Sequence, residues 1–163
     1  MTTEGGAAGV NRLEGIARDQ AARVLARGLT RHLYQLGMTA IPEVVLPNGR
    51  RADLAALGRT GEIWIIEIKS SVEDFRTDTK WRDYRAYCDR FFFASHIDVP
   101  QDIFPEDAGF ILCDGFGAGI IRHIDRQPVP APTRKALTIE LARLASLRLM
   151  TLTDPDARFH DGF

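Results

Sequence analysis

Two acidic residues and one lysine near the middle of the chain have the types and spacing of a hydrolytic metal site. Glu67 and Lys69 end the apolar run EIWIIEIK (residues 62–69), and Asp53 precedes Glu67 with a gap of 13 residues. Two carboxylates and a strand carbonyl, which Ile68 would provide, suit Mg²⁺ or Mn²⁺ because these cations prefer oxygen ligands. A cation held there would polarise a scissile phosphate and activate an attacking water, while Lys69 would orient that water. We therefore expect metal-dependent phosphodiester hydrolysis with Asp53, Glu67 and Lys69 as catalytic residues.

The geometry of this group depends on the register between two neighbouring strands. Side chains alternate along a strand, so Glu67 and Lys69 share one face. A four-residue turn at 58–61 would pair Asp53 with Ile66 and would place Asp53 on the opposite face from Glu67. A one-residue bulge, or a loop of three or five residues, returns both carboxylates to one face. The motif therefore predicts a register irregularity between residues 53 and 67.

The rest of the chain predicts an α/β fold that holds these residues at the end of a buried strand. Leucines with helical spacing recur on one face of the first helix, and Asn48-Gly49 is a strong hairpin signal because both residues accept positive φ. A sheet with helices on its faces is the expected packing. We expect helices over residues 15–36, 72–88 and 133–152, and strands over residues 41–47, 51–57, 62–69, 90–95, 109–114 and 119–124.

Length and composition indicate a soluble protein with one domain. The chain has 163 residues, of which 45% are hydrophobic, and a formal net charge of -1. Binding of nucleic acid would therefore depend on where the basic residues lie rather than on the total charge. No apolar run reaches the length of a membrane span, and we expect a cytoplasmic protein, with no membrane contact, whose Cys88 and Cys113 are reduced. The expected organisation is a disordered N-terminus over residues 1–12, one domain over 13–154 and a frayed tail over 155–163.

Three segments of the chain resemble the MmcB-like DNA repair family of bacteria: GRRAD, PEDAGFILCD and EIWIIEIKSSVEDFRTDTKWRDYRAYCDRFFFA. More broadly, Asp53 followed by Glu67-Ile68-Lys69 resembles the signature of the PD-(D/E)XK nuclease superfamily, with alanine in place of its proline. The resemblance implies a restriction-endonuclease-like core, in which helices flank a mixed central sheet, and a Mg-dependent deoxyribonuclease acting in the DNA damage response. DNA is the implied partner, and other DNA repair proteins or a second copy of the chain are further ones.

The resemblance also implies a further acidic residue from the first helix or the first strand, and Glu14 and Glu43 stand there. A two-residue loop at Asn48-Gly49 would pair Val44 with Asp53 and turn Glu43 away. A second irregularity in that hairpin would instead bring Glu43 to the side of Glu67. The sequence leaves both arrangements open.

Several basic or polar residues are candidates for DNA contact. Arginines recur every four residues on the first helix, which predicts either a solvated helix face or a phosphate-binding one. Ser70 and Ser71 also fit a helix cap, and Trp81 fits the core better than a base-stacking platform. The candidates are Arg51, Ser70, Lys80, Arg82, Arg23, Arg27 and Arg31.

Two other functions compete with hydrolysis. The first is a nuclease-fold module that binds DNA or a repair partner without cutting. The second is a generic α/β domain in which Glu67 and Lys69 form only an ion pair. Convergence of Asp53 with this pair favours the nuclease, because a binding module has no need of three buried charges.

Overall fold

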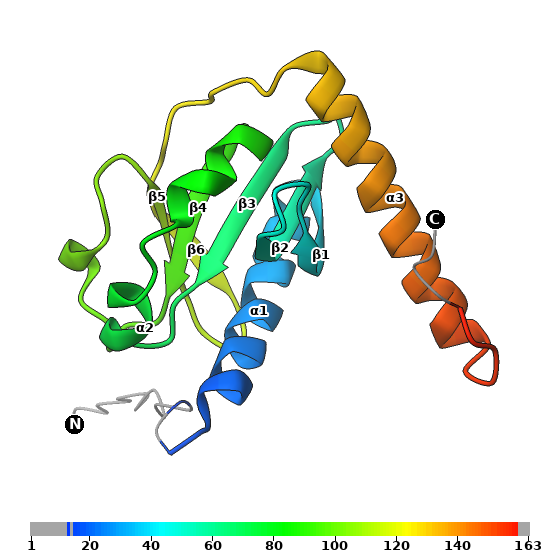
Figure 1. Ribbon diagram of the computed structural model, residues 1–163. Coiled ribbons are helices and arrows are strands. Elements are labelled where there is room, and N and C mark those ends of the chain that lie inside the picture. The colour runs from blue at the N-terminus through cyan, green and yellow to red at the C-terminus, as the bar shows by residue number, and fades with distance from the viewer. Residues whose placement is uncertain (1–12, 14, 160–163) are drawn as a thin grey trace, which may run out of the picture.

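The computed structural model describes Leu13 and residues 15–159 and has a six-stranded sheet in the order β1-β2-β3-β4-β5-β6. The sheet is mixed, because β3, β4 and β5 run parallel while the pairs β1–β2, β2–β3 and β5–β6 are antiparallel. Helices lie on both faces of the sheet (Figure 1). The elements are α1 (Arg18–Gln35), β1 (Met38–Val45), β2 (Arg51–Gly58), β3 (Ile63–Ile68), α2 (Val72–Arg76), the 3₁₀ helix η1 (Trp81–Tyr87), β4 (Arg90–Ser95), the 3₁₀ helix η2 (Gln101–Ile103), β5 (Gly109–Cys113), β6 (Ala118–Arg122) and α3 (Ala131–Thr153).

The expected mixed sheet with flanking helices is thus confirmed, but one expected helix is wrong. Residues 72–88 do not form a continuous helix, because α2 ends at Arg76 and η1 starts at Trp81. Asp78 lies in the gap, and its Oδ1 accepts a hydrogen bond from the amide of Lys80 at 3.1 Å. Such a local side-chain contact competes with helical hydrogen bonding. The expected disorder of residues 1–12 lies outside the described residues, as does the tail from 160 onward.

The β1–β2 and β2–β3 hairpins both have three-residue loops, and these loops set the register of the first three strands. In the β2–β3 hairpin the amide of Gly58 donates to the carbonyl of Glu62 at 2.8 Å, and Gly61 has φ +86°. A glycine in this left-handed region is typical of a three-residue hairpin loop with a bulge. Leu54 therefore pairs with Ile66, so the four-residue turn is wrong and the predicted irregularity is confirmed.

The β1–β2 hairpin has the same form. The amide of Leu46 donates to the carbonyl of Arg50 at 2.7 Å, Gly49 has φ +80°, and Val44 pairs with Ala52. A two-residue loop at Asn48-Gly49 is therefore wrong. Compared with the register that a two-residue loop would give, β1 is shifted by one residue against β2. The second irregularity is therefore present.

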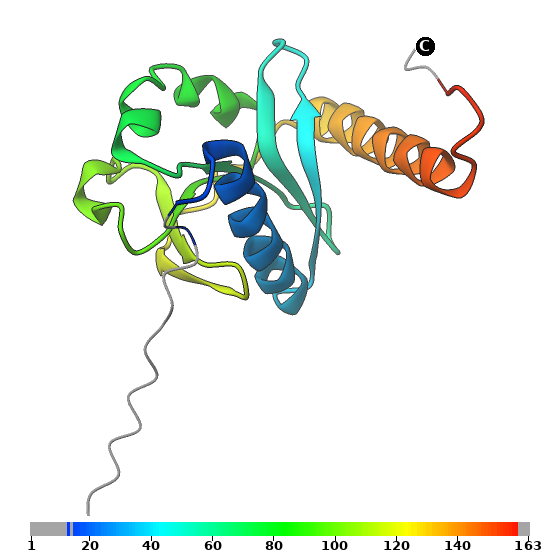
Figure 2. The ribbon, with the colours of Figure 1, turned by 90° about the horizontal axis from the view of Figure 1, so that it is seen from below.

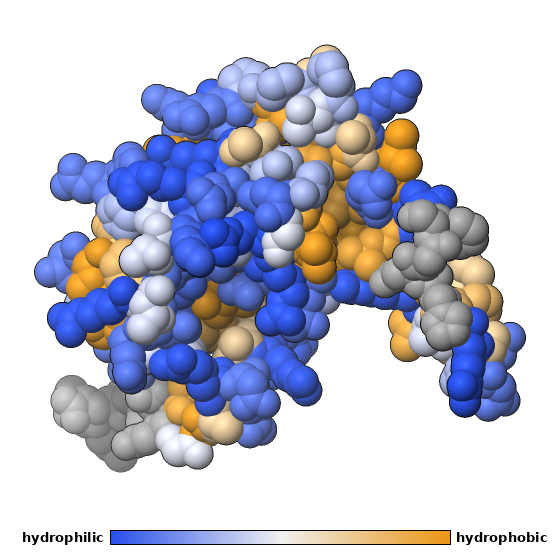
Figure 3. Space-filling view, in the orientation of Figure 1, coloured by the Kyte–Doolittle hydropathy of each residue, from blue (hydrophilic) through white to orange (hydrophobic). Residues whose placement is uncertain are grey.

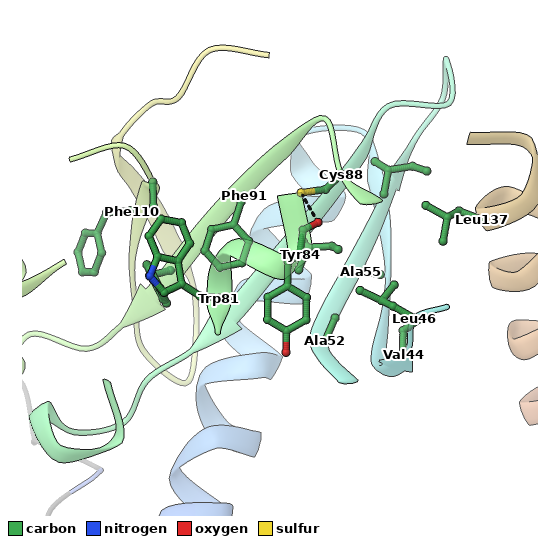
Figure 4. Close-up of a cluster of buried hydrophobic side chains, with 14 of the residues drawn as sticks. Val44, Leu46, Ala52, Ala55, Trp81, Tyr84, Cys88, Phe91, Phe110 and Leu137 are labelled. Atoms are coloured by element: carbon green, nitrogen blue, oxygen red, sulfur yellow. Dashed lines mark hydrogen bonds between the residues drawn. The ribbon is translucent and has the colours of Figure 1, made fainter. Parts of the chain in front are cut away.

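The hydrophobic core has one layer on each face of the sheet. On one face, Leu25, Leu29 and Leu33 of α1 are fully buried against β3 and β4. On the other face, η1 supplies Trp81 and Tyr84, which stack on Phe91 of β4 (Figure 4). Truncating one such buried side chain to alanine typically costs about 2 to 5 kcal/mol, so both layers hold β3 firmly in place.

Helix α3 packs through its N-terminal half, and its axis then extends away from the sheet (Figures 1 and 2), although Arg148 further along still donates to the carbonyls of Pro42 and Glu43 in β1. The carboxylate of Asp89, which precedes β4, receives both terminal nitrogens of Arg134 at 2.6 Å and the amide of Ile63 at 2.7 Å. Leu137 and Leu141 are buried, whereas Leu149, Met150 and Leu152 near the end of the helix are exposed. Figure 3 shows hydrophobic surface lining the hollow between the sheet and α3.

Among the described residues, no helix is both long and apolar enough to cross a membrane. Cys88 and Cys113 are free and buried, which agrees with the expectation of reduced thiols.

Candidate metal centre at the end of strand β3

Asp53 and Glu67 come together where the backbone ladder between β2 and β3 ends. The last paired residues are Leu54 and Ile66, so Asp53 and Glu67 are the next across the hairpin and share a face. The amide of Asp53 donates to Glu67 Oε1 at 3.1 Å, and the amide of Ile68 donates to Asp53 Oδ2 at 2.8 Å. Side-chain carboxylates thus replace the carbonyls that would continue the ladder. The three-residue loop 59–61 is the reason that Asp53 reaches this position.

Lys69 faces the same group of carboxylates from the end of β3. Its Nζ lies 3.6 Å from Glu67 Oε2 and 2.7 Å from Asp78 Oδ2. The side chains of Lys69 and Glu67 are only 8% and 7% exposed, and that of Asp78 is 16% exposed. The site therefore holds three carboxylates and one ammonium with little access to water.

Burial dominates the electrostatics of the two strand carboxylates. Loss of water raises the pKa of Glu67 to about 8, and the nearby charge of Asp53 raises it further than the ammonium of Lys69 lowers it. Burial also raises the pKa of Asp53 above its usual value, against the lowering effect of the Ile68 amide. Without a bound cation, Glu67 therefore keeps its proton near neutral pH.

Lys69 responds in the opposite way. Burial alone would lower its pKa, but the hydrogen bond to Asp78 and the charge of Glu67 together raise it above the ordinary value of 10.5. Lys69 is therefore a fixed positive charge and has no free pair with which to act as a base. Of its two acidic neighbours, Asp78 lies closer.

The donor set fits a divalent cation that prefers oxygen. With three carboxylates and one ammonium, the fully ionised site would carry a net charge of −2, which burial disfavours and a divalent cation would offset. Among the described residues, no group of three or more His, Cys, Asp or Glu side chains is arranged to hold a metal. A cation here would depend on Asp53, Glu67, the Ile68 carbonyl and water, and Mg²⁺ usually binds with few protein ligands and several waters.

Two residues of this site were missed by the sequence analysis. Asp78 was read as part of a helix, and its contact with Lys69 exists only because that helix is broken. Tyr84 is buried on η1, and its hydroxyl donates to the carbonyl of Arg51 at 2.9 Å and ties η1 to β2. The Thr-Asp-Thr stretch at residues 77–79, a poor helix former, was the available signal for the break.

The serines after Lys69 have capping and backbone roles. Ser71 caps α2 by accepting a hydrogen bond from the amide of Asp74 at 3.1 Å, as expected. The amide of Ser70 donates to Asp74 Oδ2, and its carbonyl contacts His96 Nε2 at 3.0 Å. DNA contact by Ser70 stays a prediction.

Glu43 has an unusual backbone and lies level with Asp53. Its neighbours Pro42 and Val44 pair with Leu54 and Ala52, so the register places it across from Asp53. It has φ +51°, which is rare for a residue with a side chain. Its carboxylate is 66% exposed and lies 3.8 Å from Arg51 Nη1. The second irregularity therefore places the backbone of Glu43 level with Asp53, and a role for Glu43 at the site stays a prediction, whereas Glu14 lies outside the described residues.

The basic residues divide between two sides of the sheet. Arg51, Lys80 and Arg82 are exposed on β2 and around η1, on the side of the carboxylates. Arg23, Arg27 and Arg31 lie on α1, which packs on the other face.

Two arginines of α1 also have local partners. Arg27 and Arg31 donate to the carbonyls of Gly115 and Phe116 in the β5–β6 turn. A Cβ on Gly28 would lie only 2.0 Å from the Asp114 carbonyl oxygen, so the helix presses directly on this turn. The arginine stripe is therefore separate from the site at Glu67, and its contact with DNA stays a prediction.

Comparison with known proteins gives a family and a similar structure. A family model described as DNA repair protein MmcB-like matches residues 11–156. No curated protein matches the chain. The solved structure of the SPO1766 protein of unknown function from Silicibacter pomeroyi is 38% identical, with a TM-score of 0.84, and the match covers 87% of this chain and 97% of that one.

Proposed function

Because the chain belongs to the MmcB-like family of DNA repair proteins, we propose that it is a metal-dependent nuclease that hydrolyses phosphodiester bonds in DNA. The proposed fold is the restriction-endonuclease-like core of PD-(D/E)XK nucleases. One observation carries the proposal: Asp53 and Glu67, though 14 positions apart, lie together beside Lys69 at the end of β3, where Glu67 and Lys69 are buried and Asp53 is half-buried. Two carboxylates placed together where one of them is too poorly hydrated to ionise at neutral pH are costly without a ligand, and cation binding accounts for their presence.

The proposed roles follow from the position of each group. Asp53, Glu67 and the Ile68 carbonyl would hold Mg²⁺ or Mn²⁺, which when bound supplies charge to polarise the phosphate and acidify water. Glu67 must first lose the proton that burial favours. Lys69, kept charged by its acidic neighbours, offsets negative charge that builds on the phosphate. Arg51, Lys80 and Arg82 are exposed on the same side of the sheet and would contact the DNA backbone.

A DNA- or partner-binding module without cleavage is the second candidate, and one observation favours it. The ammonium of Lys69 lies closer to Asp78 than to Glu67, so its charge already has a partner within the chain, as a module that binds without cutting would permit. If the protein cuts both strands, a homodimer would supply two sites.

A cleavage assay on linear, forked, branched and single-stranded DNA with Mg²⁺ or Mn²⁺ tests the proposal. The wild type is compared with Glu67→Gln, Asp53→Asn and Lys69→Ala, with Glu140→Gln, an exposed position on α3, as the matched control. We expect cleavage by the wild type and the control, and losses of at least about 100-fold in the other three. Equal cleavage by all five proteins would indicate a contaminant and refute the assignment. Binding of DNA without cleavage by any of them would favour the binding module.

A further inference from the structure

We infer that Asp78 is a positioning residue for the reaction, which holds the ammonium of Lys69 in place beside the metal-binding carboxylates. The inference rests on the proposed nuclease function and assigns a role to a residue that is not part of the Asp-Glu-Lys motif. Its basis is the 2.7 Å contact between Lys69 Nζ and Asp78 Oδ2, formed between side chains that are 8% and 16% exposed.

Asp78 is itself fixed, which a positioning residue requires. While Oδ2 contacts Lys69, Oδ1 accepts a hydrogen bond from the amide of Lys80 at 3.1 Å. The carboxylate therefore has a contact at each oxygen, one with Lys69 and one with the backbone of its own turn.

The segment that carries Asp78 is anchored to the end of β3 just after Lys69. Ser71 caps α2, and Asp74 Oδ2 accepts the amide of Ser70, so the first turn of α2 is tied back to the strand. The amide of Asp78 then donates to the carbonyl of Phe75 at 3.0 Å and closes the turn after α2. The break between α2 and η1 is thus an ordered turn that directs Asp78 back towards Lys69.

Lys69 needs such a partner because its other contact is weak and shared. Glu67 Oε2 lies 3.6 Å away, beyond the usual hydrogen-bond range. That carboxylate is also a proposed cation ligand, and a cation would compete with Lys69 for its oxygens. A lysine side chain has four rotatable bonds and loses rotamer freedom when it is fixed. Asp78 offsets this loss and leaves Lys69 aligned when the cation is bound.

Asp78→Asn is the sharpest test, because asparagine keeps an oxygen for the Lys80 amide and replaces the charged acceptor at Lys69 with a neutral NH₂ group. Asp83→Asn is the matched control, since Asp83 lies in the next turn of the same segment, is 50% exposed and pairs with Arg50 instead. We expect Asp78→Asn to lower kcat about 10- to 100-fold, as small misplacements of catalytic groups do. KM for DNA and the affinity for Mn²⁺ should change less than about twofold, and Asp78→Glu should recover part of the rate.

A second measurement does not depend on cleavage. The chain has three lysines, Lys69, Lys80 and Lys135, so their side-chain ammonium signals can be resolved by NMR after ¹⁵N labelling of lysine. A buried, hydrogen-bonded ammonium exchanges its protons slowly, and we expect a protected Lys69 signal in the wild type and in Asp83→Asn. In Asp78→Asn that signal should be lost.

The outcomes separate the two proposals. A protected Lys69 signal that persists in Asp78→Asn would overturn the inference. If the wild type cleaves DNA, a kcat of Asp78→Asn equal to that of the wild type would overturn it too. A loss confined to KM or to Mn²⁺ affinity would also overturn it. Absence of cleavage by the wild type, with the Lys69 signal lost as expected in Asp78→Asn, would overturn the proposed function and the catalytic role of Asp78 with it, but not their contact.

Discussion

Glu67→Gln should make the metal-free protein more stable at neutral pH while abolishing cation binding. The pKa of Glu67 rises from 4.5 to about 8 on folding, so the folded state binds a proton that the unfolded state releases. Stability from this group is fully present below about pH 4.5 and is lost as the pH rises towards 8. At 1.36 kcal/mol per pH unit, the loss reaches about 3 kcal/mol at pH 7. Glutamine has the same shape and no charge, so it avoids this loss.

The measurement is thermal and denaturant unfolding in EDTA from pH 4.5 to pH 8. Since 1 kcal/mol shifts Tm by about 2 to 4 °C in a domain of this size, the variant should melt up to about 6 to 12 °C higher at pH 7. The difference should vanish near pH 4.5. Glu140→Gln, which removes an exposed carboxylate from α3, should follow the wild type at every pH.

Adding Mn²⁺ should reverse the order of stability, so that the wild type becomes more stable than Glu67→Gln. Cation binding stabilises the folded state in proportion to the logarithm of its concentration over Kd, so the wild type should gain stability with Mn²⁺ and Glu67→Gln should not. If the two proteins had parallel stability curves in EDTA, Glu67 would not be a protonated, buried group. If the variant were less stable at pH 7, the carboxylate would be stabilising in its charged form, and the reasoning would be refuted.

Three further predictions use the same protein. Affinity for Mn²⁺, measured by calorimetry, should rise between pH 6 and pH 8 and then level off, because Glu67 must release its proton to bind; a flat profile would contradict this. Gly61→Ala should cost about 1 to 2 kcal/mol by denaturant unfolding, since alanine disfavours φ +86°, and should weaken Mn²⁺ binding more than the equally strained Gly49→Ala. Asp89→Asn should destabilise the fold by about 3 to 5 kcal/mol by removing the buried carboxylate that forms the ion pair with Arg134. Burial alone would raise the pKa of Asp89, but Arg134 and two amides lower it to about 2. The stability that Asp89 contributes should therefore be complete above pH 3.8 and lost as the pH falls to about 2. A variant as stable as the wild type at pH 6 would contradict this prediction.

Periodicity was enough to predict most of the elements. The leucines of α1 recur at helical spacing and are buried as expected, and Gly37, with φ +78°, follows the end of that helix. Helix 72–88 was wrong because its apolar spacing suits both a continuous helix and the two short pieces that form. Spacing of apolar residues cannot distinguish them, since the break is a turn fixed by polar contacts, in which Asp78 accepts the amide of Lys80 and contacts Lys69.

The alternation of side chains along a strand by itself determined that Glu67 and Lys69 share one face, because that period follows from backbone geometry alone. The sequence also predicted that Asp53 would need a register irregularity to join them. Only the tertiary structure decided its form, because loop length depends on which of several closures best fits the twist of the sheet. The same holds for Glu43, which two hairpin loops bring level with Asp53, and for the pair Asp89–Arg134, whose members are 45 positions apart. Such long-range partners meet because the fold buries them together, and no local pattern in the sequence encodes their meeting.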